Sequence, residues 1–528
     1  MRKILTTAIL CAGMVGFTAC DSFLEEEPKS SLTSVAYNQT EDQIIEQVNY
    51  LYRNGVPNKL ADMSGAYRGS NASVQCMVTG YFTNNFEGQE VDCMYARQLT
   101  RQDWTASCCN YLSNSAWTDC YKVINIANNV IKYVDDISMS DPTKYKGEAR
   151  FFRGWNYFFL VKMFGDVPMV TEPTEGNVDY PFRTTQSEVY TNVIIPDLKF
   201  AVENLPDATF AGNGHRVTKH AAAMVLADVY MRLGQYSDAV PVLQNIINSG
   251  RFSLTANVDL SLGSAFNQLR ENDDLNEVIY AYERDASISN SGNFPTKAFN
   301  SSAESFFQAS STGSKYSLWV NNYAIDARYL NVYESSDLRV QPNQFFHWSY
   351  THPIDGTVLD FDSPQNWYYY DEEAIIDTGI GTKDWNFYRY AETLLSAAEC
   401  IAQAIGVTSD AASYLAQVKA RANMEGKTAS VIATELQSLG KQAFIEECWK
   451  ERLRKFPLEM KIWDDCVRTM KFPSISSTTA GSVQFIELIG ATNGSGATFK
   501  NTDLYWPIPI NEIQRNPNLE QNEGYSRQ

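Results

Sequence analysis

Few side chains in this sequence are spaced for metal-dependent or nucleophilic catalysis. Its 528 residues include only four histidines, and none of them has the spacing of a zinc site. The motifs H-E-x-x-H, G-x-S-x-G and G-x-G-x-x-G are all missing. Gly426-Lys427-Thr428 ends like a phosphate-binding loop, but Arg421 stands where that loop requires glycine. We therefore expect a protein that is not an enzyme and that has no metal and no cofactor.

Carboxylates are the one catalytic group that the sequence offers in quantity. A pair of them can carry out the acid and base steps of glycoside hydrolysis. With 62 acidic residues some pair always exists, so a surface glycoside hydrolase stays open as an alternative. The acidic run from Asp355 to Asp362 lacks the spacing of an EF-hand. The acidic excess gives a net charge of −19, which argues against a nucleic-acid partner.

Aromatic side chains are frequent and unevenly distributed. The chain has 27 Phe, 30 Tyr and 10 Trp. Residues 290–370 contain 18 of these, against roughly 10 expected from the chain average. Residues 55–115 form a second loop-like stretch with many aromatic residues. Loops of this length in a compact protein are usually functional, so we expect binding residues in these two regions.

The first twenty residues have the anatomy of an export signal. A basic start precedes an apolar run that ends at Phe17, and Thr18-Ala19-Cys20 follows. The segment resembles the lipobox of bacterial lipoproteins, although Phe17 stands where leucine is usual. Acidic residues directly behind it resemble the surface-export signal of Bacteroidetes lipoproteins. We expect a signal peptide at 1–19, a lipid on Cys20 and a tether at 20–40, which would anchor the chain in the outer membrane facing the cell exterior.

Eight cysteines remain once Cys11 leaves with the signal and Cys20 takes the lipid. Five of them lie between residues 76 and 120, so any disulfides of the exported chain should cluster there. The other three lie in apolar, helical contexts and should be small buried hydrophobes. In chain order, the eight are Cys76, Cys93, Cys108, Cys109, Cys120, Cys400, Cys448 and Cys466.

Helical periodicity dominates the rest of the chain. Apolar positions recur at helical spacing in 117–134 and 148–164. Thr185-Gln186-Ser187-Glu188 has the spacing of a capping box, and Pro196 should kink the helix that follows. By contrast, residues 277–282 alternate like a short strand.

Two helix pairs indicate how these helices stack. Residues 218–248 predict two helices around Gly234, with the Leu-Gly-x-Tyr-x-x-Ala turn of a tetratricopeptide unit. A second alanine-rich pair, 388–405 and 409–422, is separated by Gly406. One good repeat and one weak repeat predict stacked helical hairpins in an irregular scaffold.

Five blocks in order along the chain resemble the SusD/RagB family of outer-membrane lipoproteins, which capture nutrients, mostly glycans, at the surface of Bacteroidetes cells. The second block reads K-G-E-A-R-F-F-R-G-W-N-Y-F-F-L-V-K-M-F-G-D-V-P. The fourth departs from the family pattern around Pro457. The blocks are Trp117–Asn129, Lys146–Pro168, Arg389–Glu399, Glu447–Trp463 and Tyr505–Tyr525.

The resemblance implies an all-α, mainly helical fold: a tetratricopeptide-like scaffold with a loop-rich binding subregion and a few short strands. Residues 41–528 would form a single unit. The glycan would be passed, without chemistry, to a TonB-dependent, SusC-like transporter. The charged residues of the blocks would form buried ion pairs. The scaffold would occupy about 41–54, 115–250 and 386–470, and the binding loops about 55–114 and 251–385.

Candidate ligand-binding residues come from the two loop regions. Aromatic rings stack on the apolar faces of sugars, and amide and guanidinium groups bind sugar hydroxyls. The run Trp367-Tyr368-Tyr369-Tyr370 fits packing and a binding platform equally. A peptide-capturing, RagB-like role on the same scaffold stays open. The candidates are Tyr67, Arg68, Tyr81, Asn84, Asn85, Phe86, Trp104, Phe294, Trp319, Asn321, Asn322 and Trp348.

Overall fold

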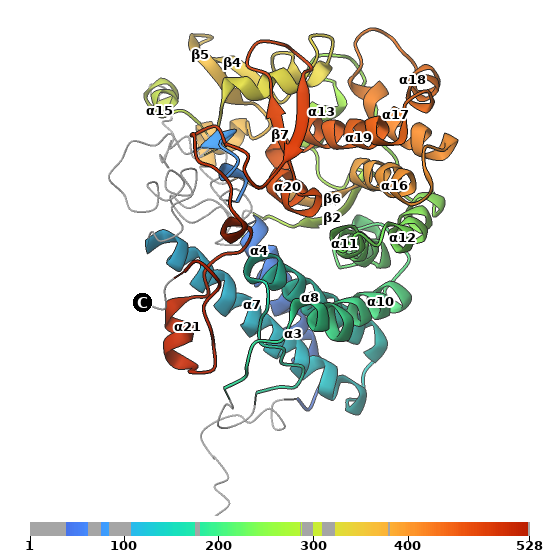
Figure 1. Ribbon diagram of the computed structural model, residues 1–528, viewed down its shortest axis with the longest axis vertical. Coiled ribbons are helices and arrows are strands. Elements are labelled where there is room, and N and C mark those ends of the chain that lie inside the picture. The colour runs from blue at the N-terminus through green and yellow to red at the C-terminus, as the bar shows by residue number, and fades with distance from the viewer. Residues whose placement is uncertain are drawn as a thin grey trace, which may run out of the picture.

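The computed structural model describes residues 38–61, 75–83, 107–174, 180–285, 287, 299–308, 323–378 and 381–525. In this part of the chain helices predominate, and the short strands pair into two-stranded antiparallel sheets (Figure 1). The predicted mainly helical class with a few short strands is confirmed. The predicted signal peptide and Cys20 lie outside the described residues.

The larger helices form one continuous arc in which each helix contacts the next (Figure 1). α19 (Lys441–Lys455) packs against α16, and α21 (Ile510–Arg515) against α7. The stacking of helical hairpins in an irregular scaffold is confirmed. The arc runs through α3 (Glu41–Arg53), α7 (Ser107–Tyr133), α8 (Pro142–Phe164), α10 (Ile195–Asn204), α11 (Lys219–Arg232), α12 (Tyr236–Asn248), α16 (Tyr390–Ile405), α17 (Ser409–Ala422) and α18 (Ala429–Gln437).

Glycines make the two predicted turns between paired helices. Gly234 joins α11 to α12 with φ +68°, and Gly406 joins α16 to α17 with φ +99°. Both angles lie where a side chain would be strained, and no atom lies within 4 Å of the Cβ that either glycine lacks. Backbone conformation, not crowding, therefore requires glycine at these turns.

The helix predicted to kink at Pro196 contains a π-helical turn just before that residue. The capping box of Thr185 and Glu188 opens α9 (Gln186–Val189), as predicted. The π turn spans Tyr190–Ile194, and the N–H of Ile195 donates to the carbonyl of Tyr190 five residues back. Because proline lacks an N–H and its ring crowds the carbonyl four residues back, the irregularity belongs next to Pro196.

The segment between α12 and α16 is an insertion, because these two helices contact each other directly. Residues 249–389 leave the arc after α12 and return to it at α16. β2 (Val278–Tyr282) pairs with β6 (Trp385–Arg389), the strand that leads into α16, so this pair lies where the insertion returns to the arc. The strand predicted at 277–282 is confirmed, although every residue of β2 is buried. The remaining pairs are β1 (Phe82–Thr83) with β3 (Ala324–Ile325), β4 (Phe346–Thr351) with β5 (Val358–Asn366), and β7 (Lys471–Ile475) with β8 (Val483–Glu487).

Among the described residues, three short α-helices lie wholly inside the ranges expected to be loops. They are α4 (Val56–Ala61), α13 (Ala265–Glu271) and α15 (Ser301–Gln308). The hydroxyl of Ser264 accepts the N–H of Asn267 and caps α13. A helix of seven residues is too short to show the periodicity by which helices are recognised in a sequence. The proposed division into scaffold and loop regions stays a prediction.

Charged residues of the sequence blocks form buried ion pairs, as expected. Arg153 of α8 binds Asp197 of α10 through two hydrogen bonds of 2.7 and 2.9 Å. Arg468 in α20 (Ile462–Thr469) binds Glu399 of α16 at 2.6 and 2.8 Å. Glu399 also accepts the indole N–H of Trp449 at 2.8 Å. These side chains hold neighbouring helices together and are unavailable to a ligand.

The cysteine predictions are settled only in part. Cys400, Cys448 and Cys466 are buried free thiols, as predicted. Cys76 and Cys120, in the region where disulfides were expected, are also free and buried. Cys93 and the side chains of Cys108 and Cys109 lie outside the description. Among the described helices, none is both long enough and apolar enough to cross a bilayer.

Candidate functional site

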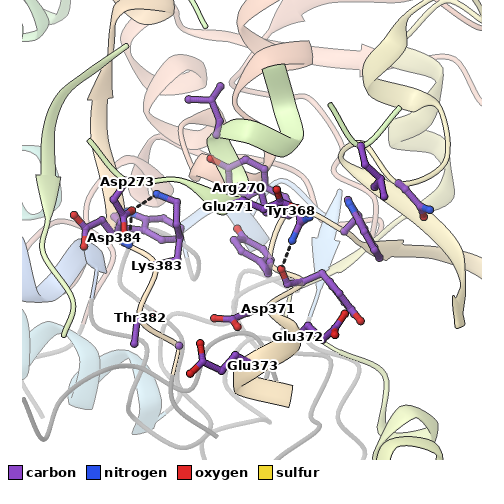
Figure 2. A pocket seen from close by; sticks show the side chains of 18 of the residues that line it. Arg270, Glu271, Asp273, Tyr368, Asp371, Glu372, Glu373, Thr382, Lys383 and Asp384 are labelled. Carbon is purple, nitrogen blue, oxygen red and sulfur yellow. Dashed lines mark hydrogen bonds and ion pairs between the residues drawn. The ribbon is translucent and has the colours of Figure 1, made fainter. Parts of the chain in front are cut away.

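The insertion contains a cavity of about 600 Å³ (Figure 2). Most of its lining comes from four pieces of chain: the end of α13, the end of β4, residues 367–373, and residues 381–386 at the start of β6. Arg284 and Glu459 also line it. Its volume is in the range of small-molecule sites, which is 300–1,000 Å³. The cavity is the candidate functional site.

Stacked aromatic rings form one wall of the cavity. The rings of Trp367 and Tyr370 stack at 4.4 Å between centroids, with 9° between their planes. The indole N–H of Trp367 donates to Asn267 Oδ1 on α13 at 2.8 Å. Arg270, one turn further along α13, lies 5.1 Å from the Trp367 ring and donates to the Tyr370 carbonyl at 2.6 Å. These contacts hold both half-buried rings in fixed orientations.

A second aromatic pair joins the cavity to the scaffold. Tyr369 and Trp385 lie with their ring centroids 6.3 Å apart and their planes 16° apart. The Tyr369 hydroxyl donates to the carbonyl of Leu458, which follows α19. Trp385 is the first residue of β6, the strand that leads into α16. This part of the wall is therefore built on the helical arc.

Carboxylates lie on opposite sides of the cavity. Figure 2 shows Asp371, Glu372 and Glu373 on one side and Asp273 and Asp384 on the other. Lys383 forms an ion pair with Asp273. The N–H of Arg284 donates to Asp384 at 2.8 Å.

Burial has raised the pKa of two of these acids. Burial, reinforced by the charge of Asp273, raises the pKa of Asp384 to about 7. Burial and the neighbouring Glu373 raise the pKa of Asp371. Both groups therefore hold protons more tightly than a free aspartic acid does, because burial disfavours their charged forms.

Two polar atoms of the lining residues are buried without a hydrogen-bond partner in the described part of the chain. They are Oδ1 of Asn386, on β6, and the hydroxyl of Tyr350, on β4. A buried polar atom without a partner is uncommon in folded proteins and costs free energy. Both residues lie where a bound molecule could supply the missing hydrogen bonds.

Most of the residues predicted as ligand contacts lie outside the described residues. Two of them, Tyr81 and Trp348, can be placed, and the structure does not bring them together at the cavity. Those outside the described residues are Tyr67, Arg68, Asn84, Asn85, Phe86, Trp104, Phe294, Trp319, Asn321 and Asn322.

Tyr81 is a core residue. It is 4% exposed, and its ring stacks on Phe472 of β7 at 5.7 Å. Its hydroxyl donates to the Pro473 carbonyl at 2.6 Å and accepts the N–H of Ile475 at 3.2 Å. Packing and hydrogen bonding within the fold account for this tyrosine completely, so its proposed contact with a ligand gains no support.

Trp348 lies beside the cavity without lining it. It is half-buried on β4 and packs on the hydrophobic core, whereas Ser349 and Tyr350 of the same strand line the cavity. The pairing of β4 with β5 is irregular between His347 and Ser349, so Trp348 lies at a break in the regular register of the strand.

The wall residues Arg270 and Trp385 were not predicted as contacts. Trp367 and Tyr370 belong to the run for which packing and a binding platform were left equally open. The available signal was the density of aromatic residues in 290–370, which includes Trp367 and Tyr370. Arg270 gave no signal, because its position over Trp367 depends on contacts about a hundred residues away. In the described residues, no group of three or more His, Cys, Asp or Glu is arranged to hold a metal ion.

The fold is a scaffold of stacked helical hairpins that carries a cavity of the size of small-molecule sites, and sequence comparison identifies its family. A family model described as "Starch-binding associating with outer membrane" matches residues 22–231, and the SusD family model matches residues 283–525. The chain belongs to the SusD/RagB family, whose members associate with the outer membrane.

Individual relatives match this chain along nearly all of its length. A SusD-like protein of Formosa agariphila is 24% identical over 546 residues, which covers 99% of each chain. A crystal structure of a SusD superfamily protein from Parabacteroides distasonis has a TM-score of 0.76 and 24% identity, covering 94% of this chain and 100% of that one. Surface glycan-binding protein A from Bacteroides thetaiotaomicron, in complex with laminarihexaose, has a TM-score of 0.65 and 18% identity, covering 92% and 100%.

Proposed function

We propose that this protein is a non-catalytic lipoprotein that captures oligosaccharides or polysaccharides at the cell surface and delivers them to a TonB-dependent, SusC-like transporter. The observation that carries the proposal is the stacked pair of Trp367 and Tyr370 in a cavity whose other walls offer polar groups. Flat rings suit the C–H faces of sugars, and polar groups suit their hydroxyls. A relative of the same fold has been solved with laminarihexaose, which supports the same ligand class.

Lipidation of Cys20 and an outward orientation belong to this proposal. They rest on the signal anatomy of the first twenty residues and on the association of the family with the outer membrane. Mass spectrometry of the protein from outer membranes tests the lipid, and protease treatment of intact cells tests the orientation. Co-purification of a large TonB-dependent barrel with the full-length protein tests the transporter.

Calorimetry of the mature chain against a panel of oligosaccharides tests glycan capture. We expect saturable binding to at least one member and no release of reducing ends on long incubation. A reducing-end signal from pure protein would favour the alternative of a surface hydrolase acting through a carboxylate pair. If no oligosaccharide binds while peptides co-purify with the protein, the peptide-capturing role replaces glycan capture.

A further inference from the structure

The cations that line the cavity are already engaged by the protein itself. Lys383 pairs with Asp273, and Arg270 binds Glu271 and the Tyr370 carbonyl. Arg284 donates to the carbonyl of Ala61. The lining residues include seven acids against these three cations, so acidic charge exceeds basic charge around the cavity.

Three carboxylates of the same lining have no such partner. Asp371, Glu372 and Asp384 form no ion pair with lysine or arginine in the part of the chain that the structure describes. Asp371 accepts the N–H of Ala374, and Asp384 accepts the N–H of Arg284. The charges of Arg270 and Lys383 reach these acids only at longer range, and burial outweighs them, because the pKa of both aspartates is raised.

The hydrogen-bonding groups point to the same kind of ligand. Asn386 is 7% exposed and lines the cavity, and its Oδ1, an acceptor, has no partner in the described part of the chain. In their ionised forms the three carboxylates are also acceptors, and an incoming cation favours those forms. The cavity thus offers acceptors in excess, and a ligand that fills it must bring donors and positive charge.

We propose that this cavity binds its glycan through a protonated amino group, so that it prefers amino sugars with a free amine to neutral sugars and excludes anionic ones. The inference rests on the proposed function, because it specifies the sugar class for the same site. A basic peptide would satisfy the same charges, but a cavity lined by the aromatic residues Trp367, Tyr370 and Trp385 favours the apolar faces of a sugar.

The decisive experiment uses tetrasaccharides that share one β-1,4-linked backbone and differ mainly in one group. Tetramers of glucosamine, glucose and N-acetylglucosamine carry an ammonium, a hydroxyl and an acetamide at C2, and a tetrameric uronic acid supplies the anion. Calorimetry of the mature chain should give binding at least about tenfold tighter for glucosamine than for the two neutral tetramers, and none for the uronic acid. Raising the ionic strength should reduce this preference.

A charge-reduced variant tests the residues. Asp371→Asn combined with Glu372→Gln should remove most of the preference for glucosamine and leave binding of the neutral tetramers nearly unchanged. Asp238→Asn, an exposed acid on α12, is the control and should change neither. Equal or tighter binding of N-acetylglucosamine or of the uronic acid would overturn the inference while leaving glycan capture intact. Binding to a trilysine peptide but to no sugar would overturn both.

Discussion

Arg389 and Glu277 form an ion pair of 2.6 Å in which neither side chain is more than 1% exposed. Arg389 is the last residue of β6, and Glu277 directly precedes β2. Arg389 also binds Glu459, which lines the cavity, and Arg421 of α17 binds Glu277 from the other side. One buried network therefore fixes the β2–β6 pair of the insertion to the scaffold.

Removing Arg389 should destabilise the whole molecule. Arg389→Met would leave Glu277 and Glu459 buried with fewer partners, and breaking a buried pair in this way costs about 3–5 kcal/mol. Denaturant unfolding measures the loss. Arg251→Met, which removes a surface pair with Asp207 at 2.6 Å, is the control and should cost under about 1 kcal/mol. Equal losses of unfolding free energy in the two variants would show that the buried network stabilises the fold no more than a surface ion pair does.

The stacked pair predicts where a sugar makes contact. Trp367→Ala should weaken binding of any oligosaccharide found in the panel by about 2 kcal/mol, or roughly thirtyfold, because it removes half of the aromatic wall. Trp348→Ala on the neighbouring strand should leave affinity unchanged if the cavity is the site. Calorimetry measures the affinity of both variants. If Trp348→Ala weakens binding and Trp367→Ala does not, the sugar binds at Trp348 instead.

Tyr81→Phe separates a structural tyrosine from a binding one. The substitution removes the hydroxyl that donates to Pro473 and accepts from Ile475. We expect a loss of about 1–2 kcal/mol in the free energy of unfolding and unchanged glycan affinity. Weaker binding without loss of stability would restore Tyr81 as a ligand contact.

Asp384 gives stability a pH dependence of defined sign. Because its pKa is raised to about 7, the folded protein keeps this proton after the unfolded chain has lost it. The stabilisation is complete below the unfolded pKa of about 4 and disappears as the pH rises towards 7. Asp384→Asn removes this effect. The free energy of unfolding of the variant, relative to that of the wild type, should therefore rise by up to about 3 kcal/mol between pH 4.5 and 7. Thermal unfolding across this range measures the gain, and parallel curves would contradict the assignment.

The scaffold could be predicted from the sequence because its signals are local. Gly234 and Gly406 mark turns, and Thr185 to Glu188 marks a helix start, wherever the rest of the chain lies. The cavity could not be predicted in this way. Trp367 is oriented by Asn267, a hundred residues earlier, and such a contact leaves no trace in the spacing of either residue. The aromatic excess indicated the region but could not tell Trp348 from Trp367.

β6 passes into α16 without an intervening residue, since the strand ends at Arg389 and the helix begins at Tyr390. Inserting a single residue into β6 would turn its side chains to the opposite face and rotate α16 by about 100° about its axis. Trp385 and the buried face of α16 therefore cannot be repositioned independently. Family members that bind different nutrients should therefore differ in the cavity walls contributed by residues 367–373 and α13. They should share the same length of β6.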